Sequence, residues 1–540
     1  MNTKQIFDCG ERLFGKRTRL LSVWQEIAEH FMPERADFTS LRDPGQDFAG
    51  NLTTSYPMIA RRDLGNAIGA MLRPTDKPWF HMRPTDDERE DIEARRWLER
   101  AESVQRRAMY DRITNFHRAT SEGDHDFSAF GQCAISVEVT FDRLAGPHLL
   151  YRNWHLRDMA WSNNASNRIG MIFRKWKPDV RTLSALFKDK VHDKVKDKAS
   201  KDPFYEVDCR HMVLEAEMVD GDFKTPYVSI YYDVENNHEI EKIGVWSPVY
   251  VIPRWLTVSG CQYAHSPAVT AALPEARLLQ AMSYTLLEAG EKAVDPPMVG
   301  DANAIRADIN LLPGGFTQVD RELDQRLIDI LSPIPLDMGG IPLGIEMQRD
   351  SRAMIAEAMF LNKLAMPGSE RKAEMTAFEV GQRVQEYIRQ AMPIFGPMEM
   401  EYNGALCDAS FELLMRHGAF GSPEDMPPSL QGADIQFRFE SPLHDIIESG
   451  KAHKFMEASQ LLAQAVAIDQ TAGVVFDAKT ALRDALLGTG VPARWNRSDQ
   501  EMQAIEEQQA AAANAQAMLG TMEQGAGIVK TLSEATRTAA

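Results

Sequence analysis

The sequence is poor in cysteine, and its five cysteines form no recognisable metal or redox motif. They are odd in number, far apart and include no C-x-x-C pair: Cys9, Cys133, Cys209, Cys261 and Cys407. This spacing excludes a disulfide scaffold and a zinc ribbon. We expect reduced, buried thiols, as is usual for isolated cysteines in a protein made in the cytoplasm.

The sequence also lacks a long apolar run. Residues 1–17 carry charges where a signal peptide needs an apolar stretch, and the uncharged run 460–468 is too short to span a bilayer. We therefore expect neither secretion nor insertion into a membrane.

Positive charge is in deficit. Lys and Arg number 60 against 78 Asp and Glu, which gives a formal net charge of −18. A surface built to grip nucleic acid neutralises phosphates with Lys and Arg, so this balance argues against tight binding. Any contact with DNA should be loose.

Motifs that could carry catalysis are weak. Gly10 to Lys16 matches a phosphate-binding loop until Arg17, where Ser or Thr is needed to hold magnesium. The match also lies in a helical pattern, and a helix interior has no free N–H groups for phosphate. His125 has no second His at a metal-binding spacing, and Ser369 with Lys372 has only a common S-x-x-K spacing. We predict no enzyme activity, no metal site and no cofactor.

The chain does have length and an ordinary globular composition. It has 540 residues, of which 44% are hydrophobic and 26% charged. At about 150 residues per domain, this length predicts three to four folding units. The lysine run 188–201 interleaves Asp and lacks aromatic residues, which favours a solvated surface over a nucleic-acid patch.

The first half of the chain predicts helices followed by antiparallel strands. Helices are predicted at 5–32, 59–72 and 86–118, and strands at 134–141, 149–154 and within 205–250. Asp220-Gly221 and Asn236-Asn237 suit hairpin turns inside the last range. The predicted fold class is mainly α with an antiparallel β region (α+β).

The second half predicts two long helices around a small insert. Ser266-Pro267 supplies an N-cap and a first-turn proline, and a helix runs from about Pro274 to Val294. The returning helix spans 343–361. The insert 295–339 holds eight Asp and Glu against three Arg, so it is locally acidic. This order implies two rods with a compact acidic piece at their far end.

Less regular elements follow. A helix is predicted at 373–416, with a kink at Pro393 and Pro397. The last predicted elements are a strand at 435–439, helices at 443–468 and 477–487, and an Ala/Gln-rich helix opened by a capping box at 498–501.

A series of short motifs occurs in one unbroken order between about residues 10 and 510. They are Trp24-x-x-Ile27 through Pro33-x-Arg35, Leu72 to Met82, Phe130-Gly131, Ser266-Pro267, Leu286 to Pro297, Pro313-Gly314-Gly315, Met375-Thr376-Ala377, Glu440 to Leu443 and Gly490-Val491-Pro492. In this order the sequence resembles the portal, or head-to-tail connector, proteins of short-tailed T7-like bacteriophages.

The resemblance implies a ring, usually of twelve identical subunits, at one capsid vertex, through which DNA is packaged and later ejected. The implied parts are a wing at 1–262, stem helices at 263–294 and 340–362, a clip at 295–339, a tunnel loop at 363–373, a kinked helix returning to the wing at 374–434, a crown at 435–497 and a helical barrel at 498–540. Twelve copies at −18 each carry −216 formal charges, which would repel a duplex more than hold it.

The resemblance also implies partners. They are the major capsid protein and scaffold, the large terminase subunit, tail adaptor proteins and double-stranded DNA passing without sequence specificity. The protein would be made in the host bacterial cytoplasm and end in the virion. The acidic clip would dock terminase and then the adaptor, with Asp301, Asp308, Asp320, Glu322 and Asp324 as candidate contacts.

A few cations are candidates for facing DNA in the channel. They are Lys292, Arg349, Arg352, Lys363, Arg371 and Lys372. Exposed helix charges or inter-subunit ion pairs explain each of them equally well. Two other functions stay open: an internal or peripheral virion protein, and a packaging NTPase that uses Lys16.

Overall fold

The computed structural model places most of the chain up to Phe439. It describes residues 1–43, 45–47, 49–50, 52–74, 78–85, 92–142, 146–296, 298–300, 331–333, 339–361, 396, 398–439, 455–464, 477, 481–482, 485–486, 502, 505 and 508. These residues fall into two compact units, Met1–Pro74 with Ala108–Leu413 and Thr75–Arg107 with Leu414–Ala540. We describe each unit by itself.

The first unit opens with two helices where the sequence predicted one. α1 spans Thr3–Lys16 and α2 spans Thr18–Phe31, and the short helix η1 (Pro33–Arg35) follows. The break lies at Arg17, whose side chain turns inward and donates hydrogen bonds to the carbonyl oxygens of Leu156 (2.7 Å) and Arg157. An amphipathic pattern cannot reveal such a break, because the positions on both sides keep the same helical period.

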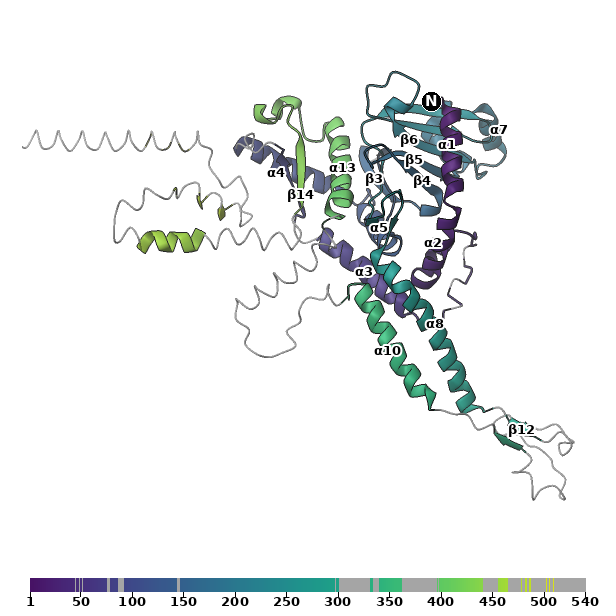
Figure 1. Cartoon of the computed structure of the whole chain (residues 1–540). Helices are drawn as coiled ribbons and strands as arrows, with labels where there is room; N and C mark the ends of the chain where they lie inside the picture. The colour runs from purple at the N-terminus through teal and green to yellow at the C-terminus, as the bar shows by residue number, and fades with distance from the viewer. Residues whose placement is uncertain are drawn as a thin grey trace, which may run out of the picture. The chain divides into compact units, whose positions relative to one another are not determined.

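A five-stranded antiparallel sheet, beside α1, is the largest sheet among the described residues of this unit (Figure 1). Its order is β4 (Met159–Asn163), β5 (Ile169–Trp176), β6 (Cys209–Glu215), β7 (Tyr227–Asp233) and β8 (His238–Val245). Ile6, Leu13 and Phe14 of α1 pack on one face, against Phe173 among others. The predicted turn at Asn236-Asn237 is confirmed, because Asp233 pairs with His238 and Asn237 has a φ of 48°.

A smaller sheet and several short elements complete the β region. The small sheet has the order β3 (Gly146–Asn153), β2 (Ile135–Asp142) and β9 (Tyr250–Val251). The other elements are η3 (Leu156–Asp158), α6 (Val180–Phe187), η4 (Lys188–Lys190), α7 (Asp193–Lys201), η5 (Ala216–Met218), β10 (Leu256–Thr257) and β11 (Ala264–His265). The predicted α+β class is confirmed.

The predicted helix 86–118 is wrong at its C-terminal end. α4 (Ile92–Met109) ends before Asn115, and α5 (Phe116–Phe130) begins after it. α5 packs against α3 (Tyr56–Leu72) and is buried on most of its surface. Its sequence alternates small, polar and aromatic residues, so it lacks the one-sided apolar stripe from which surface helices are predicted.

Three consecutive residues of α5 are each held by a different arginine. Asp124 forms a buried ion pair with Arg73, the His125 Nδ1 lies 3.0 Å from Arg61, and Asp126 forms an ion pair with Arg35 at 2.6 Å. Adjacent helix positions point in different directions, so the three side chains contact three different arginines. The triplet joins α5 to α3 and η1.

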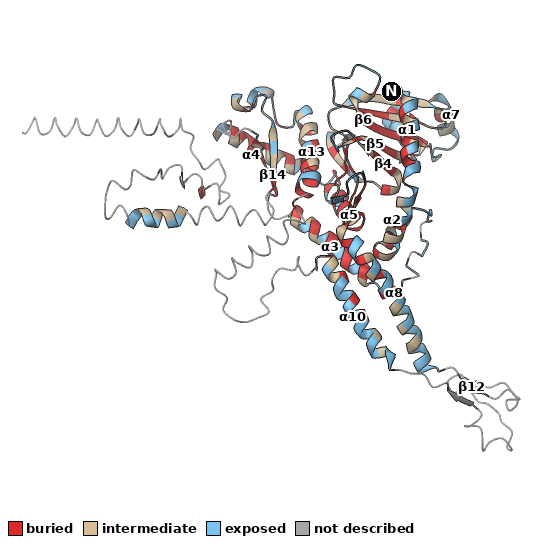
Figure 2. Ribbon diagram, in the orientation of Figure 1, coloured by how far each residue is buried: buried red, intermediate tan, exposed pale blue. Residues whose placement is uncertain are grey.

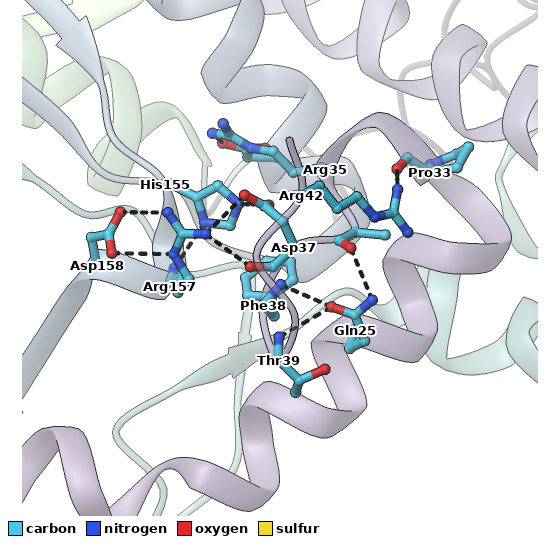
Figure 3. Close-up of polar contacts among 12 residues, drawn as sticks. Gln25, Pro33, Arg35, Asp37, Phe38, Thr39, Arg42, His155, Arg157 and Asp158 are labelled. Carbon is cyan, nitrogen blue, oxygen red and sulfur yellow. Dashed lines mark hydrogen bonds and ion pairs between the residues drawn. The ribbon is translucent and has the colours of Figure 1, made fainter. Parts of the chain in front are cut away.

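Polar contacts also fix the segment that follows η1 (Figure 3). The Asp37 carboxylate accepts hydrogen bonds from His155 Nε2 (2.5 Å) and Arg157 Nη1 (2.9 Å). The Gln25 Oε1 accepts from the backbone N–H of Phe38 at 2.8 Å. Burial alone would raise the pKa of Asp37, but the hydrogen bond and charge of His155, with the charge of Arg157, outweigh burial and lower it.

The first unit ends in a helix that starts with a π-helical turn. This turn, η7, spans Glu399–Gly404 and continues directly as α13 (Ala405–Arg416). Tyr402 and Asn403 of the turn are fully buried, and the Asn403 Oδ1 accepts a hydrogen bond from Arg73 at 2.8 Å. Of the predicted kinked helix, residues 373–395, with Pro393, and Pro397 lie outside the described residues.

The second unit contains a two-stranded ribbon and α4. β1 (Phe80–Pro84) pairs antiparallel with β14 (Ile435–Phe439), which confirms the predicted strand at 435–439. Trp79 stacks on Phe439 with ring centroids 6.3 Å apart. Two short helices, η8 (Pro423–Asp425) and η9 (Pro428–Leu430), precede β14, and residues 455–464 are helical. The predictions for 440–454 and 465–476, and most of those beyond, lie outside the described residues.

The cysteines are only partly as predicted. Cys133, Cys209 and Cys407 are buried, Cys9 is half-buried, and Cys261 is exposed. All five are free thiols. The prediction of burial is therefore wrong for Cys261, which lies in the polar connector between β10 and β11.

Candidate functional site

Two long helices that leave the core of the first unit form the candidate site. α8 spans Pro267–Val294 and α10 spans Gly340–Ala358. The Ser266 Oγ caps α8 by accepting from the Val269 N–H, with Pro267 at the first position, which confirms the predicted N-cap. The helix continues through Pro274, so the predicted start near Pro274 is seven residues too late.

The start of α8 is locked to the end of α5. The Ser266 Oγ donates to the Ser128 carbonyl oxygen at 2.7 Å. Gly131 follows α5 with a φ of 73°, and a Cβ atom there would lie 2.2 Å from the His265 carbonyl carbon. Only glycine permits this conformation and this approach together. The Phe130-Gly131 and Ser266-Pro267 motifs therefore meet in space.

α8 has a buried half and an exposed half. Ala268, Val269, Ala272, Ala276 and Leu279 are buried in the core of the unit, whereas no residue from Gln280 to Val294 is buried. Figure 2 shows the change from red to pale blue and tan along α8. The small residues at the base let α8 pack closely on α5 and α2.

α10 runs back along α8 as an antiparallel partner (Figure 1). Gly344 lies against Leu286, where a Cβ atom would approach within 2.8 Å of the leucine side chain, and the Gln348 Nε2 donates to the Ser283 Oγ at 3.0 Å. Ser351, Ile355 and Met359 return the chain to the core.

The free part of this hairpin exposes large apolar side chains. They are Tyr284 (61% exposed), Leu287 (59%), Val294 (87%), Leu343 (61%), Ile345 (46%), Met347 (45%) and Met354 (55%). A pair of helices cannot bury all its apolar residues by itself, and large exposed apolar surfaces are typical of sites that contact another molecule.

A small ribbon closes the far end of the hairpin. β12 (Met298–Gly300) pairs antiparallel with β13 (Leu331–Pro333), with Gly300 opposite Leu331. The acidic insert therefore leaves and re-enters the ribbon at neighbouring positions. Its candidate docking residues Asp301, Asp308, Asp320, Glu322 and Asp324 lie outside the described residues.

Three of the six candidate channel cations lie on the hairpin. Lys292 donates to Glu288 one turn earlier at 2.7 Å, and this hydrogen bond raises its pKa. Arg349 and Arg352 are exposed on α10, and the Arg352 guanidinium lies 5.9 Å from the Tyr56 ring centroid. Lys363, Arg371 and Lys372 lie outside the described residues.

These cations do not lie at one level. Gly344 and Gln348 contact Leu286 and Ser283, so Lys292 lies about ten residues beyond the level of Arg349. At a rise of about 1.5 Å per residue, this is about 15 Å along the rod. The three cations therefore lie in two separate bands along the hairpin, one at Lys292 and one at Arg349 and Arg352.

The phosphate-loop match is a helix interior. Gly10 lies within α1 and faces the Phe173 ring, and the following Arg17 is buried against backbone carbonyls. The helical interpretation of this match is confirmed. Within the described residues, no three His, Cys, Asp or Glu side chains gather as a metal site, and no helix has the length and apolarity to cross a bilayer.

The lysine run forms surface helices with local partners. Lys190 pairs with Glu241 at 2.6 Å, and Lys198 pairs with Glu235 at 3.0 Å and lies over the Tyr205 ring. These contacts favour the interpretation as a solvated surface.

Sequence reasoning found the hairpin but missed the contacts that hold its base. The missed residue at the base is Ser128, which binds Ser266. Arg61 and Arg73, which join α3 to α5 beside the base, were also missed, although Arg73 lies inside the Leu72 to Met82 motif. Arg73 lies at the C-terminal end of α3, directly before Pro74. Nothing in the sequence around it indicates that it pairs with Asp124, which lies 51 positions away.

Comparison with known proteins identifies the chain's relatives. A family model described as bacteriophage head to tail connecting protein matches residues 3–495. The "Probable portal protein" of Bordetella phage BPP-1 is 24% identical over 80% of this chain and 77% of its own length. The "Portal protein" of Salmonella phage epsilon15 is 23% identical over 97% of this chain and 94% of its own length.

Solved structures give distant likenesses. A chain in the virion of a native gene transfer agent particle has a TM-score of 0.33 and 11% identity over 77% of this chain and 87% of its own. A chain in the neck of that particle, with C12 symmetry, has a TM-score of 0.31 and 10% identity, covering 74% of this chain and 85% of its own. Since the family match spans most of the sequence, the chain belongs to the family of bacteriophage head-to-tail connecting proteins, which confirms the portal assignment made from its motifs.

Proposed function

We propose that copies of this chain close into a ring, with α8 and α10 of each copy side by side around a channel for double-stranded DNA. The observation that carries this proposal is the hairpin itself. Its free half exposes apolar side chains on both helices, while its base is fixed to a packed core. Neighbouring copies would cover those side chains, and repetition of one head-to-tail contact closes a ring.

The proposal includes the parts that the resemblance implied. Twelve subunits would form the ring at one capsid vertex, with the wing toward the capsid protein and scaffold. The insert carried by β12 and β13 would dock the large terminase subunit and later the tail adaptors. The chain would be made in the host cytoplasm. The domain boundaries and the docking residues stay predictions.

The channel would pass DNA without gripping it. The net charge of −18 per chain supports this part, because tight DNA binding requires phosphate neutralisation. Energy for packaging would come from a separate ATP-hydrolysing motor. The alternative of a packaging NTPase is disfavoured because Gly10 and Lys16 lie inside α1.

The mass of the purified oligomer tests the ring directly. We expect native mass spectrometry to give one mass near twelve chains and negative-stain images to show rings with a central hole. A chain that stays a single subunit at every concentration and salt would refute the proposal. ATP turnover that Lys16→Ala abolishes would support the NTPase instead.

A further inference from the structure

The charges of α10 are sorted into two columns of opposite sign. An α-helix turns about 100° per residue, so Arg349 and Arg352 lie within about 60° of one another. By the same rule, Glu346, Asp350 and Glu357 lie within about 40° of one another, and the two columns are separated by about 110°. We call these sets the basic column and the acidic column.

Within the described residues none of the five side chains forms an ion pair, and Arg352 contacts only the Tyr56 ring, at 5.9 Å from its centroid. All five are exposed, although Glu346 and Arg349 lie three positions apart on the same helix, at a spacing that allows an ion pair. By contrast, Lys292 and Glu288 on α8 do pair at 2.7 Å. The geometry of α10 keeps its two signs apart and leaves both columns available.

Each column borders an exposed apolar flank. Gly344 and Gln348 contact α8, and Ser351 is buried on the same side of α10, so the exposed residues of α10 lie on either side of that contact. Helical rotation places Ile345 with the basic column on one side. It places the exposed Leu343, Met347 and Met354 on the other side, next to the acidic column.

We propose that the acidic column of one copy contacts the basic column of the next copy in the ring. The partner is a second copy of this chain, because the two flanks of one hairpin are complementary to each other in charge and are both apolar. A head-to-tail contact of this kind brings unlike flanks together at every step. An apolar centre with charged borders is also the usual anatomy of a protein interface.

This inference rests on the proposed ring and changes the role of two candidate residues. Arg349 and Arg352 then pair with the neighbouring subunit and do not face DNA. Opposite charges at the border select the correct register and handedness of assembly, since the reversed contact would bring like charges together.

A mixing experiment tests the contact. R349E/R352E makes both columns acidic, and E346R/D350R/E357R makes both basic. We expect each variant alone to need at least about tenfold more protein for half-maximal ring formation than the wild type. Mixed in equal amounts, the two variants should form alternating rings again, with equal amounts of each chain by mass spectrometry.

The control reverses as many charges as R349E/R352E, at another place in the fold. K194E/K201E alters two exposed lysines of α7 and should assemble like the wild type. Circular dichroism and thermal unfolding should match the wild type for all chains. If a reversed-charge variant is misfolded, the neutral R349Q/R352Q still tests the contact, because its rings should need more protein to form at low salt and should respond less to added salt than wild-type rings.

The outcomes separate the inference from the proposed function. Normal rings from both variants, or folded variants whose mixture stays unassembled, would overturn the paired columns while the ring stands. R349E/R352E rings that assemble normally but pass DNA differently would restore the channel-facing role. A wild-type chain that forms no ring would remove the proposed function itself.

Discussion

Gly131 is the residue at which two of the sequence motifs meet. Its φ of 73° is available to alanine at a cost of about 1 kcal/mol, but a Cβ atom would also overlap the backbone of His265 and Ser266. We expect Gly131→Ala to lower the free energy of unfolding by about 3 kcal/mol or more, because the start of α8 must move. Urea unfolding followed by circular dichroism measures this.

Gly146 offers a matched control. Its φ is 75°, and no atom lies within 4 Å of the position that a Cβ would take. Gly146→Ala should therefore cost only the backbone term of about 1 kcal/mol. Equal losses for the two variants would mean that the contact with His265 contributes nothing.

His211 gives the first unit a dependence on pH. It is fully buried, stacks on Tyr231 and binds the hydroxyl groups of Tyr250 and Ser229. Burial, and secondly the charge of Arg174, hold its pKa well below 6.5. Below pH 6.5 the unfolded chain takes up a proton that the folded chain refuses, so stability should fall by up to about 1.4 kcal/mol per pH unit.

A variant isolates this contribution. His211→Gln removes the titrating ring and should flatten the slope of the unfolding free energy between pH 6.5 and 5. His117→Gln changes an exposed histidine and should keep the wild-type slope. An unchanged slope in His211→Gln would assign the pH dependence to other groups.

At this scale the sequence reveals residue types but not partners. The triplet Asp124-His125-Asp126 can be seen in the sequence, but the residues that it contacts cannot. Its three arginine partners come from positions 51 to 91 residues away, with no spacing rule to link them. Trp24 and Arg35, which carried the resemblance, prove to be a core side chain and an ion-pair residue.

At the scale of elements, the ribbon of β12 and β13 makes the insert removable. Gly300 and Leu331 are paired, so replacing residues 302–330 by Asn-Gly leaves a three-residue connection between strands that already align. We expect such a chain to form rings like the wild type and to lose binding of the tail adaptor. Ring mass and a pull-down of adaptor protein measure the two effects separately.

The insert replacement has two informative failures. Insoluble protein would mean that the insert is part of the fold of the hairpin and not an independent piece. Rings that still capture the adaptor would place the docking surface elsewhere. Substituting Asp301, Asp308, Asp320, Glu322 and Asp324 by Asn or Gln in the full insert tests charge without shortening the chain.

Elements were predictable where the pattern and the boundary signals agree. The residue pattern and the boundary signal agree at three places, which are the end of α8 at Asp295-Pro296-Pro297, the turn before β8, and β14. They disagree at Pro274, where proline suggested a helix start although its ring is tolerated inside α8. The N-cap Ser266 and Pro267 did mark the earlier start, but the contacts of this start with Ser128 and Gly131 are tertiary, and no local signal contains them.

At the scale of the whole molecule, the net charge limits how tightly the channel can hold DNA. A conduit must release DNA in either direction, and a chain with a net charge of −18 cannot offer a large excess of cations to the phosphates. If the acidic column of one copy pairs with the basic column of the next, Arg349 and Arg352 bind the neighbouring subunit and not DNA. The hairpin then presents fewer free cations to DNA than its sequence suggests.

A binding measurement follows from this balance. We expect assembled rings to bind a short DNA duplex no more tightly than about 10⁻⁴ M at physiological salt, the weak end of non-specific binding. Lowering the salt should raise the affinity only slightly, because few counterions are released when few phosphates are neutralised. Fluorescence anisotropy of a labelled duplex gives both quantities. Micromolar affinity that falls a thousandfold between 50 and 200 mM salt would instead indicate a channel lined by a dense belt of cations, and Lys292 with residues 363–372 would be the first positions to substitute.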